Sequence, residues 1–460
     1  MQRDEFGESS PGELVAIPGG WAFLPNTLPA PINLTWELAA SLERATRALS
    51  RLDGEALLIP NRPLVLRPLL TREAVESARL EGTHTHIAGV LLQEGAVPPS
   101  DPGEASNNQE VLNHLTASGD GERWIAEGRP INLMFLRSLH AVLLKGGENR
   151  RPGEFRPGQV LIGAQGDSPE RATFVPPPEH VQAAIDDVLR YVKASTPHPP
   201  LIAAGVTHYQ FETIHPFEDG NGRLGRLLIP LQLMAAGAIS NPLIYLSPFF
   251  EARRDEYLQR LKAVSTNGAW IEWLLFFLDA VETQAIDAHA RVERVLALQQ
   301  RYRTIASQAS SRVPLRAVDL IMERVIVTAP EVATFTACNY HTARGALDAL
   351  TRMGIVEPLA RSHPQRWWAR ELVSEIMSGS LICHIQRLRC PRASGSEQTV
   401  VAGVEGDLDA VPQPEAAEDA RHVVLDRALA DHKPRGDLPI RRARRQEAEH
   451  LALAGRERVD

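Results

Sequence analysis

A glycine-rich turn between two long apolar segments restricts the fold of this chain more than any other feature of its sequence. The two segments, residues 200–215 and 223–237, have the length and apolarity of buried helices. Between them stands PFEDGNG, in which Pro216 fixes the exit from the first helix and the glycines permit a tight change of direction. The sequence therefore predicts two core helices joined by a short turn that is rich in polar side chains.

Helical periodicity recurs along most of the first 300 residues and predicts a mainly α protein. The leucines of residues 34–49 share one stripe of a predicted helix. Further helices are predicted at 70–80, as two segments within 107–145, at 180–194 and across 253–303 with a break near residue 267. Residues 153–181 are the exception, because their glycines, prolines and alternating apolar residues predict a short hairpin or flap.

Composition excludes some classes of protein. Hydrophobic residues make up 43% of the 460 and charged residues 23%, as in ordinary soluble proteins. The net charge of -8 argues against a chain built to coat nucleic acid, although a local basic patch stays possible. The three cysteines lack zinc-site or redox spacing, and the acidic N-terminus lacks the apolar region of a signal peptide. We therefore expect a reducing, cytoplasmic location and no membrane-spanning helix.

The turn itself has the features of an anion site. Gly220 and Gly222 bracket Asn221 directly before a helix, so several backbone N–H groups can converge at the positive end of the helix dipole. Arg223 and Arg226 lie three residues apart, so both guanidinium groups can reach one side of this turn. Arginine is well suited to bidentate phosphate contacts. The pattern predicts a phosphate cradle.

Two further residues of the turn suggest a reaction. A lone carboxylate beside a di- or triphosphate, here Asp219, is a usual way to hold Mg²⁺. His215 ends the first helix, where an imidazole can act as a base near neutral pH. Together they suggest attack of a hydroxyl on a nucleotide phosphate. The alternative is a plain helix–loop–helix corner with a surface salt bridge. A Walker loop and a zinc hydrolase are unsupported, because G-K-[ST] and H-E-x-x-H are missing.

The stretch HPFEDGNGRLGR, residues 215–226, resembles the signature HPFx[D/E]GNGRxxR of the Fic (filamentation induced by cAMP) family. Residues 152–163 and 172–181 resemble the segments that precede this signature in Fic proteins, and residues 243–264 resemble the helix pair that follows. The resemblance covers roughly residues 20–370. It implies a Fic-type helical bundle with a short β-hairpin flap.

The resemblance also implies a reaction, the transfer of AMP from ATP to a Ser, Thr or Tyr hydroxyl of a protein. By that implication His215 deprotonates the hydroxyl and Asp219 binds Mg²⁺ between the α- and β-phosphates. Asn221 and the amides of the turn hold the α-phosphate. Arg223 contacts the phosphates, and Arg226 holds the γ-phosphate so that the chain is aligned for in-line attack.

Two outlying groups of residues belong to the same implied site. Tyr245 and Tyr257 fall where relatives line the adenine pocket, although core packing is an equal alternative for both. Thr173, Phe174 and Val175 would clamp the target protein by strand addition.

The stretch SARLEG, residues 77–82, is called the brake segment here. On a helix Ser77 and Glu81 share one face, and Gly82 would cap the end. Alone it reads as an ordinary exposed helix end. Beside a Fic core it resembles the inhibitory pattern [S/T]xxxE[G/N], which implies that Glu81 pairs with Arg226 and occupies the place of the γ-phosphate. In some relatives this glutamate also supports AMP removal.

The sequence divides into four expected regions. They are an N-terminal regulatory region at 1–105, a catalytic core at 106–300, a winged-helix-like domain at 301–375 and a poorly ordered tail at 376–460. In the third region Arg344 and Arg352 could meet nucleic-acid phosphates, and a protein-docking or dimerising role is an equal alternative.

The favoured function is therefore Mg²⁺-dependent protein adenylylation that uses ATP, with self-modification and homodimer formation as further possibilities. The alternatives are a DNA-binding regulator whose site senses nucleotide, an enzyme that mainly removes AMP, and transfer of another nucleotide or phosphocholine. His208 lies on the face of His215 but is expected to be a packed histidine, not a metal ligand.

Overall fold

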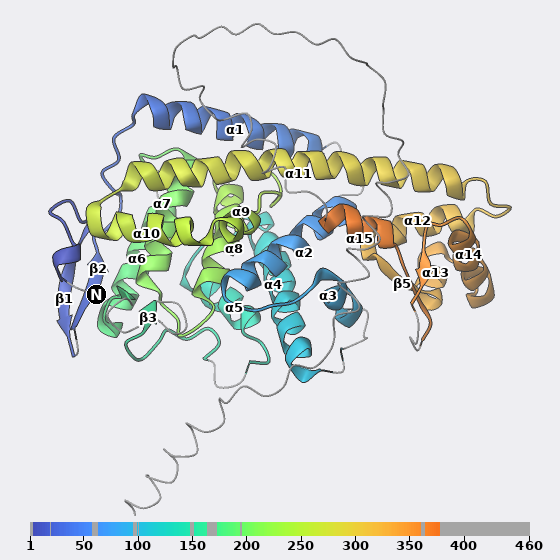
Figure 1. The fold of residues 1–460 in the computed structure, drawn as a ribbon, viewed down its shortest axis with the longest axis horizontal. Coiled ribbons are helices and arrows are strands. Elements are labelled where there is room, and N and C mark those ends of the chain that lie inside the picture. The colour runs from blue at the N-terminus through green and yellow to red at the C-terminus, as the bar shows by residue number, and fades with distance from the viewer. Residues whose placement is uncertain are drawn as a thin grey trace, which may run out of the picture. The chain divides into compact units, whose positions relative to one another are not determined.

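The computed structural model describes residues 3–18, 20–57, 63–94, 99, 101–147, 151–162, 173–193, 196–359 and 364–377. The chain divides into two units, Met1–Cys390 and Pro391–Asp460. Every element named below belongs to the first unit and is drawn in colour in Figure 1. Apart from its first two residues, the tail predicted at 376–460 lies outside the described residues.

The described residues are mainly helical, as the periodicity predicts. The helices are α1 (Trp36–Leu57), α2 (Pro63–Leu80), α3 (Ile87–Glu94), α4 (Pro102–Ala126), α5 (Leu133–Leu143), α6 (Pro178–Lys193), α7 (Pro200–Ile214), α8 (Asn221–Ala235), α9 (Ser247–Ala252), α10 (Arg254–Asn267), α11 (Trp270–Ala306), α12 (Val313–Arg324), α13 (Ala329–Thr336), α14 (Tyr340–Arg352) and α15 (Arg370–Met377). A 3₁₀ turn, η1 (Arg3–Glu5), precedes the first strand.

Three small antiparallel sheets accompany the helices. Near the N-terminus β1 (Gly12–Ile17) pairs with β2 (Gly20–Pro25). The predicted flap is present as β3 (Leu161–Ile162) and β4 (Thr173–Phe174), with Leu161 opposite Phe174; residues 163–172 between them lie outside the described residues. The third sheet has the order β5–β7–β6, formed by β5 (Ile326–Thr328), β6 (Glu357–Pro358) and β7 (Arg366–Trp368).

Helices α7 and α8 form the centre of the main core. Almost every residue of both helices is buried, which explains why their sequences lack a polar face. Phe217, in the turn between them, is fully buried beside Phe211 and Leu224, so it plugs the core below the turn. Phe217 thereby holds the turn against the hydrophobic interior. Helices α4, α5 and α6 pack around this pair.

The long helix α11 connects this core with the C-terminal elements. It lies beside α1 along much of its length (Figure 1). Gly268, with φ 66°, ends α10 and produces the break that the sequence predicts near residue 267. Trp273 is fully buried and donates its indole N–H to the carbonyl of Gly205 in α7, at 3.0 Å. Helix α11 is therefore fixed to the central helices.

Residues 313–377, called the C-terminal module here, contain α12–β5–α13–α14–β6–β7–α15 in chain order. Helices α13 and α14, joined by a turn, are followed in this module by the two short strands β6 and β7. Arg344 and Arg352 are exposed on α14. The winged-helix assignment of this module stays a prediction, and so does its role.

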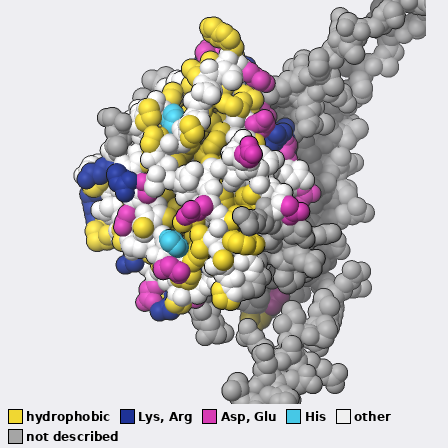
Figure 2. Space-filling model, turned by 90° about the vertical axis from the view of Figure 1, so that its left-hand side faces the viewer, with side chains coloured by type: hydrophobic (Ala, Val, Ile, Leu, Met, Phe, Trp, Pro, Cys, Tyr) yellow, Lys and Arg dark blue, Asp and Glu magenta, His cyan; other side chains and the backbone are white. Residues whose placement is uncertain are grey.

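Two observations concern the surface. None of the helices in the described ranges combines the length and apolarity needed to cross a membrane. Figure 2 shows the side on which β1 and β2 lie; in its described part, hydrophobic and acidic side chains are interspersed, and lysine and arginine gather near one margin. That part of the surface therefore offers no broad basic area.

Candidate active site

His215 ends α7 in the left-handed conformation, with φ 49°. Its backbone N–H donates to the carbonyl of Phe211, and its Nδ1 lies 3.2 Å from the carbonyl of Glu212. A carbonyl only accepts, so this contact assigns the proton to Nδ1 and leaves Nε2 with a free lone pair. Burial lowers the pKa of His215 to about 4, although Glu81 and Asp219 oppose the shift. The imidazole is therefore neutral at pH 7 and can accept a proton.

Asn221 gives the turn its shape. Its Oδ1 accepts from the backbone N–H of Phe217 and its Nδ2 donates to the carbonyl of the same residue, both at 2.9 Å. Gly220 stands before the helix with φ 78° and caps it with no side chain, so the first amides of α8 keep no partner within the helix. The amides of residues 221–223 are thus placed as the predicted cradle requires, and the binding of a phosphate there stays a prediction. The side-chain amide of Asn221 is committed to the turn, which leaves its backbone N–H for an anion.

His140, on α5, is a residue of the site that the sequence analysis missed. Its Nε2 lies 2.9 Å from the carbonyl of Asp219, and its Nδ1 accepts the backbone N–H of Gly153 at 2.8 Å. The ring stacks on Phe217 with centroids 3.6 Å apart. Burial lowers its pKa to about 4, so it stays neutral. The sequence predicted only that residues 107–145 are helical. It could not indicate this contact, because His140 and Asp219 are 79 positions apart in the chain.

Arg156 is a second residue that the sequence analysis missed, although it lies within residues 152–163, which resemble a Fic segment. It is 3% exposed and donates only to backbone carbonyls among its described hydrogen bonds. Its Nε reaches the carbonyl of His215 at 2.8 Å, and its Nη2 reaches that of Pro176 at 2.5 Å. Burial lowers its pKa to about 10, so it stays charged at neutral pH. Arg156 thus ties the end of α7 to the base of the flap.

The brake segment meets the second arginine of the turn. Arg226 donates from Nη2 to Glu81 Oε1 at 2.7 Å and to the carbonyl of Ser77 at 2.9 Å. Its Nε donates to the Ser77 hydroxyl at 3.0 Å. Gly82, with φ 84°, ends α2 with backbone bonds from Gly82 to Arg79 and from residue 83 to residue 78. The pairing implied by the resemblance is present in this geometry.

The buried charge of Arg226 requires a nearby negative charge, and Glu81 supplies it when no other anion is bound. Arg226 is 4% exposed, and burial opposes its charge, yet Glu81 raises its pKa above the ordinary value. Burial raises the pKa of Glu212 to about 8, so that nearby carboxyl group is largely neutral at pH 7. Glu81 is therefore the carboxylate that balances Arg226. Although burial works against its ionised form, Arg226 lowers the pKa of Glu81.

Gly222 lets the Glu81 carboxylate lie directly against the first turn of α8, because it has no side chain. A Cβ atom built on Gly222 would lie 2.0 Å from Glu81 Oε1 and 2.7 Å from Arg226 Nη1. The carboxylate thus occupies space directly over the first turn of α8, where an anion would sit. The Glu81 side chain remains 33% exposed, so it can be displaced without unfolding the core.

Arg223 is held by two carboxylates. Its Nη1 donates to Glu110 on α4 at 3.0 Å, and its Nη2 donates to Asp219 at 3.2 Å. Glu110 also accepts from the hydroxyl of Thr83, directly after the brake segment, at 3.0 Å. The sequence analysis missed Glu110. Among the described contacts Arg223 thus lies beside the cradle with its charge balanced from two elements.

Asp219 is the candidate metal ligand. Its carboxylate is 38% exposed and accepts the backbone N–H of Gly220 at 2.6 Å. The described residues contain no group of three His, Cys, Asp or Glu side chains that could hold a metal ion. A single exposed carboxylate beside the amide cradle fits Mg²⁺, which takes few protein ligands and the rest from phosphate and water.

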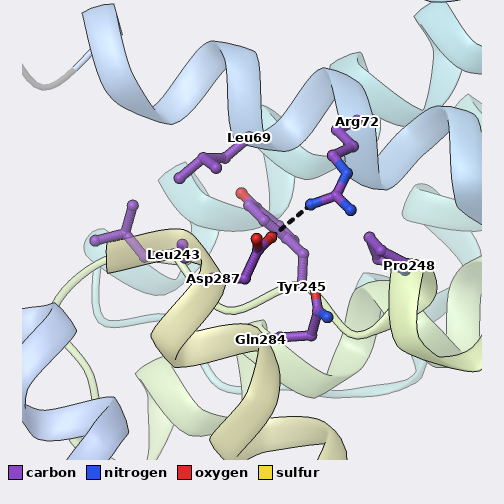
Figure 3. Close-up of a pocket in the computed structure, with 8 residues that line it drawn as sticks. Leu69, Arg72, Leu243, Tyr245, Pro248, Gln284 and Asp287 are labelled. Atoms are coloured by element: carbon purple, nitrogen blue, oxygen red, sulfur yellow. Dashed lines mark hydrogen bonds and ion pairs between the residues drawn. The ribbon is translucent and has the colours of Figure 1, made fainter. Parts of the chain in front are cut away.

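The two tyrosines predicted for an adenine pocket lie in different places. Tyr257 interacts with Arg226, and its hydroxyl lies 2.9 Å from Nε2 of the buried His208. His208 is a packed histidine, as expected. Tyr245 lines a separate small pocket with Arg72 and Asp287 (Figure 3). The structure thus brings Tyr257, but not Tyr245, next to the cradle residues.

The flap residues divide in a similar way. Thr173 and Phe174 form β4, paired with β3 on one edge. Val175 is 1% exposed, and its carbonyl accepts from Gln159 at 2.5 Å. Val175 therefore anchors the base of the flap to the core.

Comparisons with known proteins address the family. A model of the Fic/DOC family matches residues 130–233, and a model of the N-terminal part of that family matches residues 39–123. A protein adenylyltransferase Fic of Drosophila willistoni is 36% identical over 111 residues, which are 23% of this chain and 20% of that protein. Protein adenylyltransferase fic-1 of Caenorhabditis elegans is 29% identical over 110 residues, with shares of 23% and 20%. The chain spans about a fifth of the length of the curated relatives it matches.

A solved structure supports the fold. The crystal structure of a Fic family protein from Desulfovibrio desulfuricans G20 matches with a TM-score of 0.50 and 21% identity, covering 74% of this chain and 98% of that one. One family model includes the brake segment and the other includes the turn with both of its arginines. The motif and the two matched models therefore agree that residues 39–123 and 130–233 of this chain are of the Fic/DOC family. The solved structure shows a similar fold.

Proposed function

We propose that the protein transfers AMP from ATP to hydroxyl side chains of proteins and that Glu81 restrains this activity. The observation that carries the proposal is the position of His215. Its neutral imidazole is close enough to Asp219 and Glu81 for both carboxylates to affect its pKa, and the turn that follows it leads into the amides of residues 221–223 and the buried arginines Arg223 and Arg226. A base beside a phosphate-binding turn is what hydroxyl attack on phosphorus requires.

In the proposed reaction Nε2 of His215 takes the proton of the target hydroxyl. The hydroxyl oxygen bonds to the α-phosphorus, the bond from this phosphorus to the bridging oxygen breaks, and pyrophosphate leaves. The amides of residues 221–223 hold the α-phosphate oxygens, and Arg223 and Arg226 neutralise the charge farther along the phosphate chain. Asp219 would hold Mg²⁺, which supplies further neutralisation of the phosphates when bound.

Restraint by Glu81 follows from its contact with Arg226. A γ-phosphate and the Glu81 carboxylate would compete for one guanidinium and for the same space over Gly222. ATP would therefore bind weakly or in an unproductive position while the brake segment is in place. The relatives named protein adenylyltransferase support the activity, but they match only 110 or 111 residues of this chain.

We expect the target to be a protein whose backbone adds to the flap. A strand in this position would be recognised through main-chain hydrogen bonds, so target choice would depend weakly on local sequence. Self-modification is the simplest case to detect.

The test uses ATP labelled at the α- or the γ-phosphate. The Glu81→Gly variant should incorporate the α-label into protein at least about tenfold faster than the unmodified chain, because the competing carboxylate is gone. The double variant Glu81→Gly/His215→Ala should lose the incorporation. No γ-label should be transferred by any of the three. Incorporation of the γ-label, or α-label that survives loss of His215, would contradict the proposal.

A further inference from the structure

Helix α2, which ends in the brake segment, is fastened to the long helix α11 by one carboxylate. Asp287 on α11 is 4% exposed, and its Oδ2 accepts from Arg72 Nη1 at 2.7 Å and from Arg291 Nε at 2.8 Å. Figure 3 shows Arg72 reaching from α2 to this carboxylate. We call these three residues the Asp287 anchor.

Packing around the anchor is incomplete. A small pocket lies between α2, α11 and residues 243–248, which lead into the start of α9 (Figure 3). It is lined by residues of all three: Leu69, Arg72, Leu243, Tyr245, Pro248, Gln284, Asp287 and Ala288. The second carboxylate oxygen of Asp287, Oδ1, is buried and has no hydrogen-bond partner among the described residues. At this level α2 is therefore held to α11 by a buried ion pair that lies beside a small unfilled volume.

The anchor also reaches the C-terminal module. Arg291 Nη1 donates to the backbone carbonyl of Glu375 in α15 at 3.3 Å, and Arg294 pairs with the Glu375 carboxylate at 3.1 Å. Three elements that are far apart in sequence, α2, α11 and α15, are thus linked through two buried side chains of α11, Asp287 and Arg291.

A shift of α2 at Arg72 would also move the end of the helix that contacts Arg226. Glu81 lies nine residues beyond Arg72, or roughly 14 Å along the axis at 1.5 Å per residue. A helix behaves as a rod over this length, so a change in the seat of Arg72 moves the Ser77 and Glu81 contacts with Arg226. We propose that Asp287, acting through Arg72, is a positioning residue that sets the strength of the brake. This inference rests on the proposed function.

The variant Arg72→Met separates positioning from simple destabilisation. Methionine keeps most of the apolar stem of Arg72, and Asp287 keeps Arg291 as its partner, so the core stays folded. We expect the α-label from ATP to be incorporated about tenfold faster than by the unmodified chain, within the range of typical coupling between sites. In the Glu81→Gly background the same substitution should change the rate less than twofold, because no brake is left to move.

Backbone hydrogen exchange supplies a readout that does not depend on activity. Exchange at the α2 amides of residues 71–80 should be faster in Arg72→Met than in the unmodified chain. Asp287→Asn should act in the same direction. Arg51→Ala removes an exposed ion pair with Glu55 on α1 and serves as the matched control, with no change in either readout.

The outcomes are distinct. The proposal is supported if Arg72→Met speeds incorporation in the unmodified chain but changes the rate less than twofold in the Glu81→Gly background. Unchanged exchange at α2 overturns it, and so does faster exchange without faster incorporation when Glu81→Gly is active. If no variant transfers AMP, the proposed function fails. ATP affinity then decides the inference, since tighter binding by Arg72→Met supports it and unchanged binding overturns it.

Discussion

The imidazole of His140 lies 2.9 Å, through Nε2, from the backbone carbonyl of Asp219. The Nδ1 atom of the ring is occupied by the N–H of Gly153, so Nε2 carries the proton and donates. A residue of α5 thereby fixes the backbone of the candidate metal ligand. The turn before α8 is thus held by two contacts of His140: the stack of its ring on Phe217 and its hydrogen bond to the Asp219 carbonyl.

Replacing His140 should loosen the loop without removing any group that touches substrate. His140→Phe keeps an aromatic ring on Phe217 but leaves the Asp219 carbonyl and the Gly153 N–H without this partner. Leaving a buried polar group unsatisfied costs about 1–3 kcal/mol. We expect a lower melting temperature and at least about tenfold slower AMP incorporation in the Glu81→Gly background. His198→Phe, which removes a histidine bonded to Tyr191 outside the site, is the control. Equal activity of the two variants would refute the role of His140.

Removing the Ser77 hydroxyl should release the brake in part. The Arg226 guanidinium would lose one hydrogen bond at Nε but keep Glu81 and the Ser77 carbonyl. One net hydrogen bond of about 1 kcal/mol corresponds to roughly fivefold faster incorporation by Ser77→Ala. The increase should be smaller than that of Glu81→Gly. Thr71→Val is the matched control, because among the described hydrogen bonds the Thr71 hydroxyl donates to the carbonyl of Arg67 within α2 and does not reach Arg226. A Ser77→Ala rate equal to that of the unmodified chain would count against a contribution from this hydroxyl.

The pH dependence of the reaction should be unusual for a histidine base. Burial lowers the pKa of His215 to about 4 from an ordinary value of 6.5, and Glu81 is one of the groups that oppose the shift. The base must be unprotonated, so kcat/KM of the Glu81→Gly variant should stay level from pH 8 to about 5.5 and fall only as the pH approaches the lowered pKa. A midpoint near 6.5 in this profile would show that the imidazole is solvated in the active state.

Magnesium dependence tests the role of Asp219. Asp219→Asn removes the negative charge but leaves Arg223 paired with Glu110. We expect the Mg²⁺ concentration for half-maximal incorporation to rise about tenfold, as the loss of one ligand charge weakens a site that draws its other ligands from phosphate and water. Glu218→Gln changes the exposed neighbouring carboxylate and should leave the Mg²⁺ requirement unaltered. Equal requirements for the two variants would remove Asp219 from the metal site.

His114 makes the fold sensitive to acid. This residue of α4 is 1% exposed, and neither ring nitrogen has a hydrogen-bond partner among the described residues. Burial, with smaller contributions from Arg226 and Arg223, lowers its pKa from 6.5 to about 3. The unfolded chain therefore binds a proton that the native state refuses, and stability is lost progressively as the pH falls from about 6.5 towards 3.

The variant His114→Leu should reduce this acid sensitivity. Leucine fills a similar volume without unpaired nitrogens, so the melting temperature at pH 7 should be equal or higher, and its decrease between pH 7 and pH 5 should be smaller than in the unmodified chain. Thermal unfolding at several pH values measures both. An unchanged dependence on pH would mean that His114 is protonated or hydrated in the folded state.

The sequence by itself determined the local features of this protein. Apolar segments on both sides of PFEDGNG predicted the buried helices α7 and α8, since a helix that lacks a polar face must be covered. Glycine at 220, 222 and 82 predicted a tight turn and a helix end, because positive φ and close approach favour a residue without Cβ. The full signature at residues 215–226 also carried the resemblance to the Fic family, because its defining positions are contiguous in the chain and can be read without the fold.

Only the tertiary structure decided which distant residues complete the site. His140, Arg156 and Glu110 have no local pattern that marks them, because their partners lie on other elements and their bonds go to backbone carbonyls or to an arginine of another helix. The structure also separated Tyr245 from Tyr257 and fastened α2 to α11 through Asp287. These relationships depend on how helices pack, and packing is fixed by the whole core and not by the residues on either side of a motif.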